Sequence, residues 1–188
     1  MKKLPITMQT APHQIDQNIW LYVKLPQLAI EAVTTNTAIL LKEVPVAVAC
    51  SHKNAQRIDC CNQSAKAWGV DPLMSVSTAL AICPDLTVLT KNVQQEQQLL
   101  QQLALIAYRF SPEIIIDTDG LWLDLSGCAQ LFNGYNRLLK KLYTQLCRQS
   151  VNATSGVGKS PMAAKLLCST KFHQYLPDSG EIQCALMT

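Results

Sequence analysis

The feature that constrains the fold most is a pair of apolar runs joined by an Asp-Gly turn. Residues 113–117 read Glu-Ile-Ile-Ile-Asp and residues 121–125 read Leu-Trp-Leu-Asp-Leu, with Asp119 and Gly120 between the two runs. An Asp-Gly pair between apolar runs is a strong short-range signal for a β-hairpin. The chain is therefore predicted to contain antiparallel strands, which a fold of strictly alternating strands and helices does not require.

Amphipathic helices are predicted on both sides of this hairpin. Apolar residues recur at helical spacing from Val93 to Phe110 and again from Tyr135 to Cys147. Strands and helices thus mix without strict alternation, and we predict an α+β domain whose mixed or antiparallel sheet is covered by helices. Other apolar runs predict strands at 19–25, 44–50, 57–61 and 151–157, and helices at 28–41, 62–68, 75–83 and 161–169.

The composition agrees with one folded domain or a domain with a small lobe. Of the 188 residues, 48% are hydrophobic and 15% are charged, so a substantial core can form. No apolar run approaches the roughly 18–20 residues that span a bilayer. The net charge of +3 permits contact with phosphates but does not predict it.

The cysteines indicate a reducing compartment. The basic start at Met1 to Lys3 is followed by no continuous apolar segment, so we expect no secretory signal and a cytoplasmic location. No two cysteines are spaced as Cys-x-x-Cys, and several fall inside apolar segments. We therefore expect free thiols, and neither disulfides nor a zinc site, at positions 50, 60, 61, 83, 128, 147, 168 and 184.

A glycine-containing segment resembles a phosphate-binding loop. Residues 155–160 read Ser-Gly-Val-Gly-Lys-Ser between a predicted strand and a predicted helix. A Walker A loop needs a further glycine where this chain has Ala153, and Pro161 follows directly. We favour a simple turn before a helix, and a nucleotide-binding module stays the weaker alternative.

Three aspartates near the hairpin are candidates for metal chemistry. Phosphoryl transfer by two metal ions needs several carboxylates from different segments. The first predicted strand, residues 21–25, supplies a lysine and no carboxylate. We interpret Asp117 and Asp119 as turn residues and expect Asp124 to form a hydrogen bond near Ser126. A Mg²⁺-dependent nucleotidyltransferase is the alternative.

The order of segments is more informative than any single motif. AKAWGVDPLMS and ALAICPDL precede the long helix, RFSPEIIIDTDGLWLDLSGCAQLFNG contains the hairpin, and TSGVGKSPMAAKLL follows. This order resembles the palm and fingers of the Y-family (UmuC-like) DNA polymerases over residues 19–169. More narrowly, it is similar to the ImuB-type, polymerase-like mutagenesis proteins.

The resemblance implies a division of the chain into a palm and an inserted lobe. It predicts a lead-in, a first part of the palm, a small fingers-like lobe and a second part of the palm. We also expect the chain to stop before the thumb and little finger of that family. The expected boundaries are residues 1–18, 19–50, 51–90 and 91–188.

The resemblance also implies that the polymerase chemistry is lost. Active members carry an Asp in the first strand and an Asp-Glu pair in the hairpin. These positions match Tyr22 and Asp119-Gly120, so Asp119 alone remains as a weak metal candidate, and we expect neither catalysis nor a cofactor. The aromatic residue that excludes ribose falls near Pro26, and the Tyr and Arg that hold the incoming triphosphate fall at Gln63 and Lys66.

The implied function is that of a non-catalytic accessory or adaptor in DNA repair and damage-induced mutagenesis by translesion synthesis. Family members bridge the sliding clamp, a RecA-like accessory protein and an error-prone replicative-type polymerase, and act at the nucleoid. Direct contact with DNA is expected to be weak and non-specific, with Lys66, Lys159 and Lys165 as candidates. A non-functional remnant of a longer protein is a further alternative.

Overall fold

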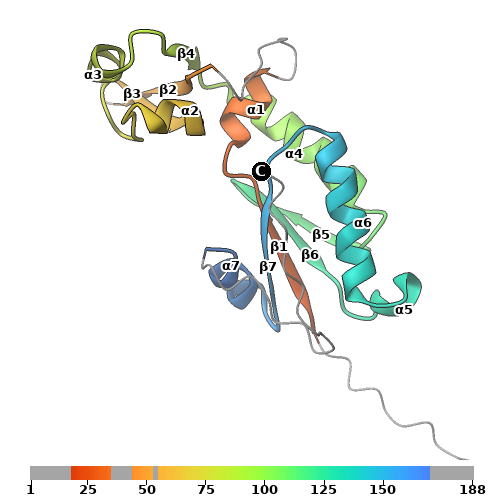
Figure 1. Cartoon of the computed structure of the whole chain (residues 1–188). Coiled ribbons are helices and arrows are strands. Elements are labelled where there is room, and N and C mark those ends of the chain that lie inside the picture. Colours follow the sequence, from red (N-terminus) through yellow and green to blue (C-terminus); the bar gives the residue numbers. More distant parts are fainter. Residues whose placement is uncertain (1–17, 35–43, 53–54, 170–188) are drawn as a thin grey trace, which may run out of the picture.

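The structure is a computed structural model, which describes residues 18–34, 44–52 and 55–169. Two sheets organise these residues (Figure 1). The larger sheet has the strand order β5-β6-β1-β7, and every neighbouring pair is antiparallel. Its strands are β1 (Trp20–Lys24), β5 (Glu113–Ile116), β6 (Gly120–Asp124) and β7 (Thr154–Gly158).

The smaller sheet has the order β3-β2-β4, in which β2 is antiparallel to β3 and parallel to β4. Together with α2 and α3 it forms a separate lobe, which α1 and α4 link to the larger sheet (Figure 1). Its strands are β2 (Val46–His52), β3 (Ala55–Cys61) and β4 (Thr87–Thr90). The helices are α1 (Leu28–Thr34), α2 (Gln63–Ala67), α3 (Val76–Ile82), α4 (Val93–Ala107), α5 (Ala129–Phe132), α6 (Tyr135–Arg148) and α7 (Pro161–Ser169).

Strand β1 lies in the middle of the larger sheet and is buried on both faces. Successive side chains of a strand point to opposite faces. Leu21 and Val23 pack with the leucines of α4 and α6, whereas Tyr22 packs with α7. This two-sided burial explains why the centre of β1 has no charged residue, and it places Tyr22 on the face of the sheet that α7 covers.

The α+β class and the central hairpin are confirmed, and two assignments need correction. The expected boundary of the small lobe after residue 50 falls inside β2, which pairs with β3 and β4. The lobe therefore includes residues 46–50, because an apolar run predicts a strand but not the sheet that it joins. The pattern also missed β4 and α5, which are short. Residues 35–41 of the expected first helix lie outside the described residues.

A buried carboxyl group ties α1 to the segment before β7. The side chain of Glu31 is 4% exposed and accepts hydrogen bonds from the backbone N–H of Asn152 (2.6 Å) and from its Nδ2 (2.9 Å). Burial raises the pKa of Glu31 from 4.5 to about 7, although the hydrogen bonds from Asn152 oppose this change. The folded protein therefore holds a proton here that the unfolded chain releases at lower pH.

We expect this group to make the protein less stable as the pH rises from about 4.5 to about 7. In this pH range Glu31 is ionised in the unfolded chain but still protonated in the folded protein. Rising pH therefore lowers the free energy of unfolding, by up to about 3 kcal/mol. Glu31→Gln should flatten this part of the pH profile, as measured by urea unfolding at successive pH values. The exposed Glu113→Gln is the matched control. An unchanged pH profile in Glu31→Gln would contradict the assignment.

Candidate functional site

The hairpin aspartates meet a buried tyrosine from the neighbouring strand. In the register of β1 with β6, Tyr22 lies opposite Trp122, and their ring centroids are 4.3 Å apart. The Tyr22 hydroxyl donates a hydrogen bond to Asp119 and lies 3.3 Å from Oδ2 of Asp117. A phenol thus stands between the two carboxylates, at the position that the sequence resemblance matches to a first-strand aspartate.

Each aspartate also has a lysine partner. Nζ of Lys165 in α7 lies 2.6 Å from Oδ2 of Asp117, and Nζ of Lys24 in β1 lies 3.5 Å from Oδ2 of Asp119. The ammonium group of Lys165 also lies 5.1 Å from the centroid of the Tyr22 ring, which is a cation–π distance. Two negative charges therefore face two positive charges within the protein itself.

The protonation states fit this internal pairing. The hydrogen bond from Lys165 holds the pKa of Asp117 below its usual range, and the same contact raises the pKa of Lys165. Burial raises the pKa of Tyr22, and the hydrogen bond to Asp119 raises it further. At neutral pH the phenol is a proton donor, Asp117 is ionised and Lys165 is charged.

Gly120 occupies a position that has no room for a side chain. A Cβ atom built there would lie 2.2 Å from the carbonyl oxygen of Val23 and 3.1 Å from the Tyr22 ring. β1 and β6 therefore approach too closely for any other residue without a shift of the backbone. The Val23 carbonyl group and the Tyr22 ring fill the space that a side chain at position 120 would need.

These residues do not fit a two-metal centre. Mg²⁺ is held by several carboxylate oxygens, usually from different segments. Within residues 18–34, 44–52 and 55–169, no three His, Cys, Asp or Glu side chains are grouped to hold a metal ion. The oxygens of Asp117 and Asp119 accept hydrogen bonds from Tyr22 and face the ammonium groups of Lys24 and Lys165, which would repel a cation.

The turn interpretation of the aspartates is incomplete. Asp117 does accept a hydrogen bond from the backbone N–H of Thr118 at 2.8 Å, as a turn residue would. Its contacts with Tyr22 and Lys165 come from segments 95 and 48 residues away, and no local pattern reports them. Asp124 accepts hydrogen bonds from the backbone N–H and hydroxyl of Ser126, which confirms that prediction.

The glycine-containing segment is explained by close packing. Gly156 and Gly158 lie in β7 against α7, where added Cβ atoms would lie 2.2 Å and 2.7 Å from backbone atoms of Ala164. The Ser160 hydroxyl accepts a hydrogen bond from the backbone N–H of Ala163 at the start of α7. The two glycines therefore bring strand and helix together, which supports the simple-turn interpretation over a nucleotide-binding loop.

The three lysine candidates lie in different settings. Lys66 is exposed on α2 in the small lobe, and Lys159 is exposed at the turn between β7 and α7. Lys165 is paired with Asp117, so its charge is already compensated. Of the other matched positions, Gln63 begins α2 and is exposed, and Pro26 is exposed in the turn before α1.

The fold and the arrangement of the site together identify the class of protein to which this chain belongs. A palm-like sheet with a carboxylate-bearing hairpin, joined to a small lobe between β1 and α4, is the arrangement of a Y-family (UmuC-like) polymerase domain. The chain belongs to the impB/mucB/samB family, whose model matches residues 29–169. The resemblance seen in the sequence is therefore confirmed at the level of the family.

Individual relatives agree with this assignment. The chain is 28% identical over 123 residues to DNA polymerase IV of Serratia proteamaculans, which covers 65% of this chain and 35% of the relative. It is 31% identical over 121 residues to Protein ImuB of Caulobacter vibrioides. This alignment covers 64% of this chain and 26% of that relative. The chain thus spans between about a quarter and about a third of the length of these curated relatives.

Solved structures share the fold. The post-insertion binary complex of Dbh DNA polymerase matches with a TM-score of 0.70 and 16% identity over 80% of this chain and 45% of that one. The crystal structure of DinB from Sulfolobus solfataricus matches with a TM-score of 0.66 and 17% identity. This match covers 80% of this chain and 45% of the DinB chain. The match to part of each structure agrees with a palm and fingers arrangement.

Two further properties concern the described part of the chain. Seven cysteines lie in it, and all seven are free. None of its helices is both long and apolar enough to cross a lipid bilayer.

Proposed function

We propose that this chain is a polymerase-like domain that does not transfer nucleotides and acts as an accessory or adaptor factor in DNA repair and damage-induced mutagenesis. The observation that carries the proposal is the internal pairing of the two hairpin aspartates. The Tyr22 hydroxyl donates a hydrogen bond to Asp119 and lies 3.3 Å from Oδ2 of Asp117, and Lys24 and Lys165 balance the charge of the two carboxylates. These contacts occupy the groups that a polymerase needs for its metal ions.

Nucleotidyl transfer is the second candidate, because several relatives are named DNA polymerase IV. The groups around Asp119 argue against nucleotidyl transfer by this chain. A metal ion at Asp119 would have to displace both the Tyr22 hydroxyl and the Lys24 ammonium group, and it would gain no carboxylate from position 120. We therefore place the role of this domain in binding other components of translesion synthesis.

The partners follow from the same proposal. DNA, the sliding clamp, a RecA-like accessory protein and an error-prone replicative-type polymerase are the components to test, at the nucleoid in the cytoplasm. Direct binding to DNA should be weak and salt-dependent, because few cations of the site are uncompensated. Lys66 and Lys159 are exposed and are the candidates for this contact, whereas the charge of Lys165 already faces Asp117.

We expect no primer extension by the purified chain with either Mg²⁺ or Mn²⁺. A gel assay of labelled primer-template measures this, with DNA polymerase IV of Serratia proteamaculans as the active control. Templated incorporation that disappears in Asp119→Ala would overturn the proposal.

A genetic experiment separates an accessory role from a non-functional remnant. Deletion of the gene should lower the frequency of damage-induced mutations, and the Asp119→Ala variant should restore it as well as the unchanged gene does. An unchanged mutation frequency after deletion would favour the remnant. Restoration by the unchanged gene alone would show that the carboxylate of Asp119 is needed.

A further inference from the structure

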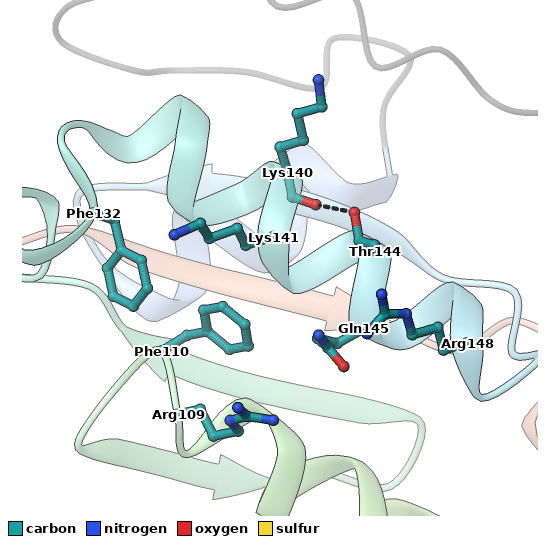
Figure 2. A pocket seen from close by; sticks show the side chains of 8 residues that line it. All are labelled: Arg109, Phe110, Phe132, Lys140, Lys141, Thr144, Gln145 and Arg148. Carbon is teal, nitrogen blue, oxygen red and sulfur yellow. Dashed lines mark hydrogen bonds between the residues drawn. The ribbon is translucent and has the colours of Figure 1, made fainter.

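A basic groove lies on the far side of the larger sheet from the candidate site. It has a volume of about 530 Å³ and is formed by α6, by the segment that follows α4, and by the end of α5 (Figure 2). α6 packs on the face of the sheet that carries Leu21 and Val23, whereas Tyr22 faces α7. The groove and the aspartates are therefore separate surfaces. Its lining residues are Arg109, Phe110, Phe132, Lys140, Lys141, Thr144, Gln145 and Arg148.

All the charged residues that line this groove are positive. Arg109, Lys140, Lys141 and Arg148 are all exposed, and no lining residue is acidic. None of the four cations forms an ion pair with another residue in the described part of the chain. Uncompensated like charges in a concave surface attract an anionic partner and raise its rate of association.

The floor of the groove is aromatic. Phe110 is only 7% exposed, and its ring lies 5.6 Å from that of Phe132, centroid to centroid. The ammonium group of Lys141 lies 5.5 Å from the centroid of Phe132. Phe132 is half-buried, so part of its ring offers an apolar contact beside the cations. Such a combination is typical of protein interfaces with charged rims.

We propose that this groove binds an acidic segment of a partner protein, in which Asp and Glu side chains pair with Arg109, Lys141 and Arg148 and an apolar side chain rests on Phe132. The Lys140 side chain points away from the groove (Figure 2). Arginine forms bidentate hydrogen bonds with carboxylates, and both Arg109 and Arg148 are available for this. The pairing cations of α6 span Lys141 to Arg148, about two helical turns, which matches a short peptide segment.

A nucleic acid fits the same groove less well. Binding to single strands relies on aromatic faces that are open for stacking with bases. Here Phe110 is buried against Phe132, and Lys141 lies over the Phe132 ring. The aromatic faces are therefore already used, and the cations are confined to one short groove.

The test uses the full chain and a fluorescein-labelled peptide that repeats Glu-Asp-Leu-Glu, measured by fluorescence anisotropy at low salt. Lys141→Glu together with Arg148→Glu should weaken binding at least about tenfold. The matched control is Arg137→Glu, an exposed cation on the same helix that does not line the groove, and it should change the affinity less than about twofold. The milder Lys141→Gln with Arg148→Gln should give a smaller loss in the same direction.

Two further probes separate the parts of the proposal. A peptide that repeats Gln-Asn-Leu-Gln should not bind, and one that repeats Glu-Asp-Ser-Glu should bind more weakly than the leucine peptide. Equal losses in the groove variants and in Arg137→Glu would overturn the proposal, because net charge alone would then explain binding. Binding of oligothymidylate that is lost in the groove variants, with no binding of the acidic peptide, would assign the groove to nucleic acid instead.

Discussion

Replacing Tyr22 with alanine is expected to lower the free energy of unfolding by about 3–5 kcal/mol. The side chain is fully buried at the centre of the larger sheet, and it packs against Trp122, Ala164 and Cys168. Truncation leaves a cavity between β1 and α7 and removes the hydroxyl that donates to Asp119 and lies close to Asp117. Urea unfolding followed by circular dichroism measures the change.

Tyr22→Phe is the matched variant, because it keeps the ring and removes only the hydroxyl. We expect a loss of about 1–2 kcal/mol, since the carboxylates keep Lys24 and Lys165 as partners. A Phe variant as unstable as the Ala variant would show that the hydrogen bonds, rather than packing, hold this residue. Two variants as stable as the unchanged protein would contradict the burial of Tyr22.

Gly120→Ala is expected to destabilise the protein by about 2–4 kcal/mol. The new Cβ would lie 2.2 Å from the carbonyl oxygen of Val23, so β1 and β6 would have to separate at the centre of the sheet. Thr118→Ala, an exposed change in the same hairpin, should alter stability by no more than about 0.5 kcal/mol. Chemical denaturation of both variants gives the comparison, and equal small effects would contradict the close approach.

The same geometry has a consequence for function. Gly120→Glu would restore the glutamate of active Y-family enzymes, yet its Cβ meets the same backbone oxygen and the Tyr22 ring. We expect this variant to be at least as unstable as Gly120→Ala and to gain no metal-dependent activity. Tyr22 and Gly120 thus form one packed unit, and recovery of a metal site would require both positions and the backbone of β1 to change.

The sequence determined the elements of this fold that depend on local pattern. The hairpin around Asp119 and Gly120, the helical stripes of α4 and α6, and the strand β1 all follow from spacing of apolar residues, because backbone hydrogen bonds and side-chain periodicity are local properties. The order of these segments also identified the family. The resemblance also led us to expect, from Tyr22 and Gly120, that the metal ligands are missing, and this expectation stays a prediction.

The tertiary structure alone decided which side chains meet. Lys165 is 48 residues from Asp117, and Asn152 is 121 residues from Glu31, so no local spacing reports either contact. The assignment of β2 to the small sheet depended in the same way on its neighbours β3 and β4. The apolar spacing of α6 predicted the helix, but the meeting of its cations with Phe110 required the packing of α4 and α6 on one face of the sheet. Such contacts arise from burial of side chains between elements, which only the assembled core determines.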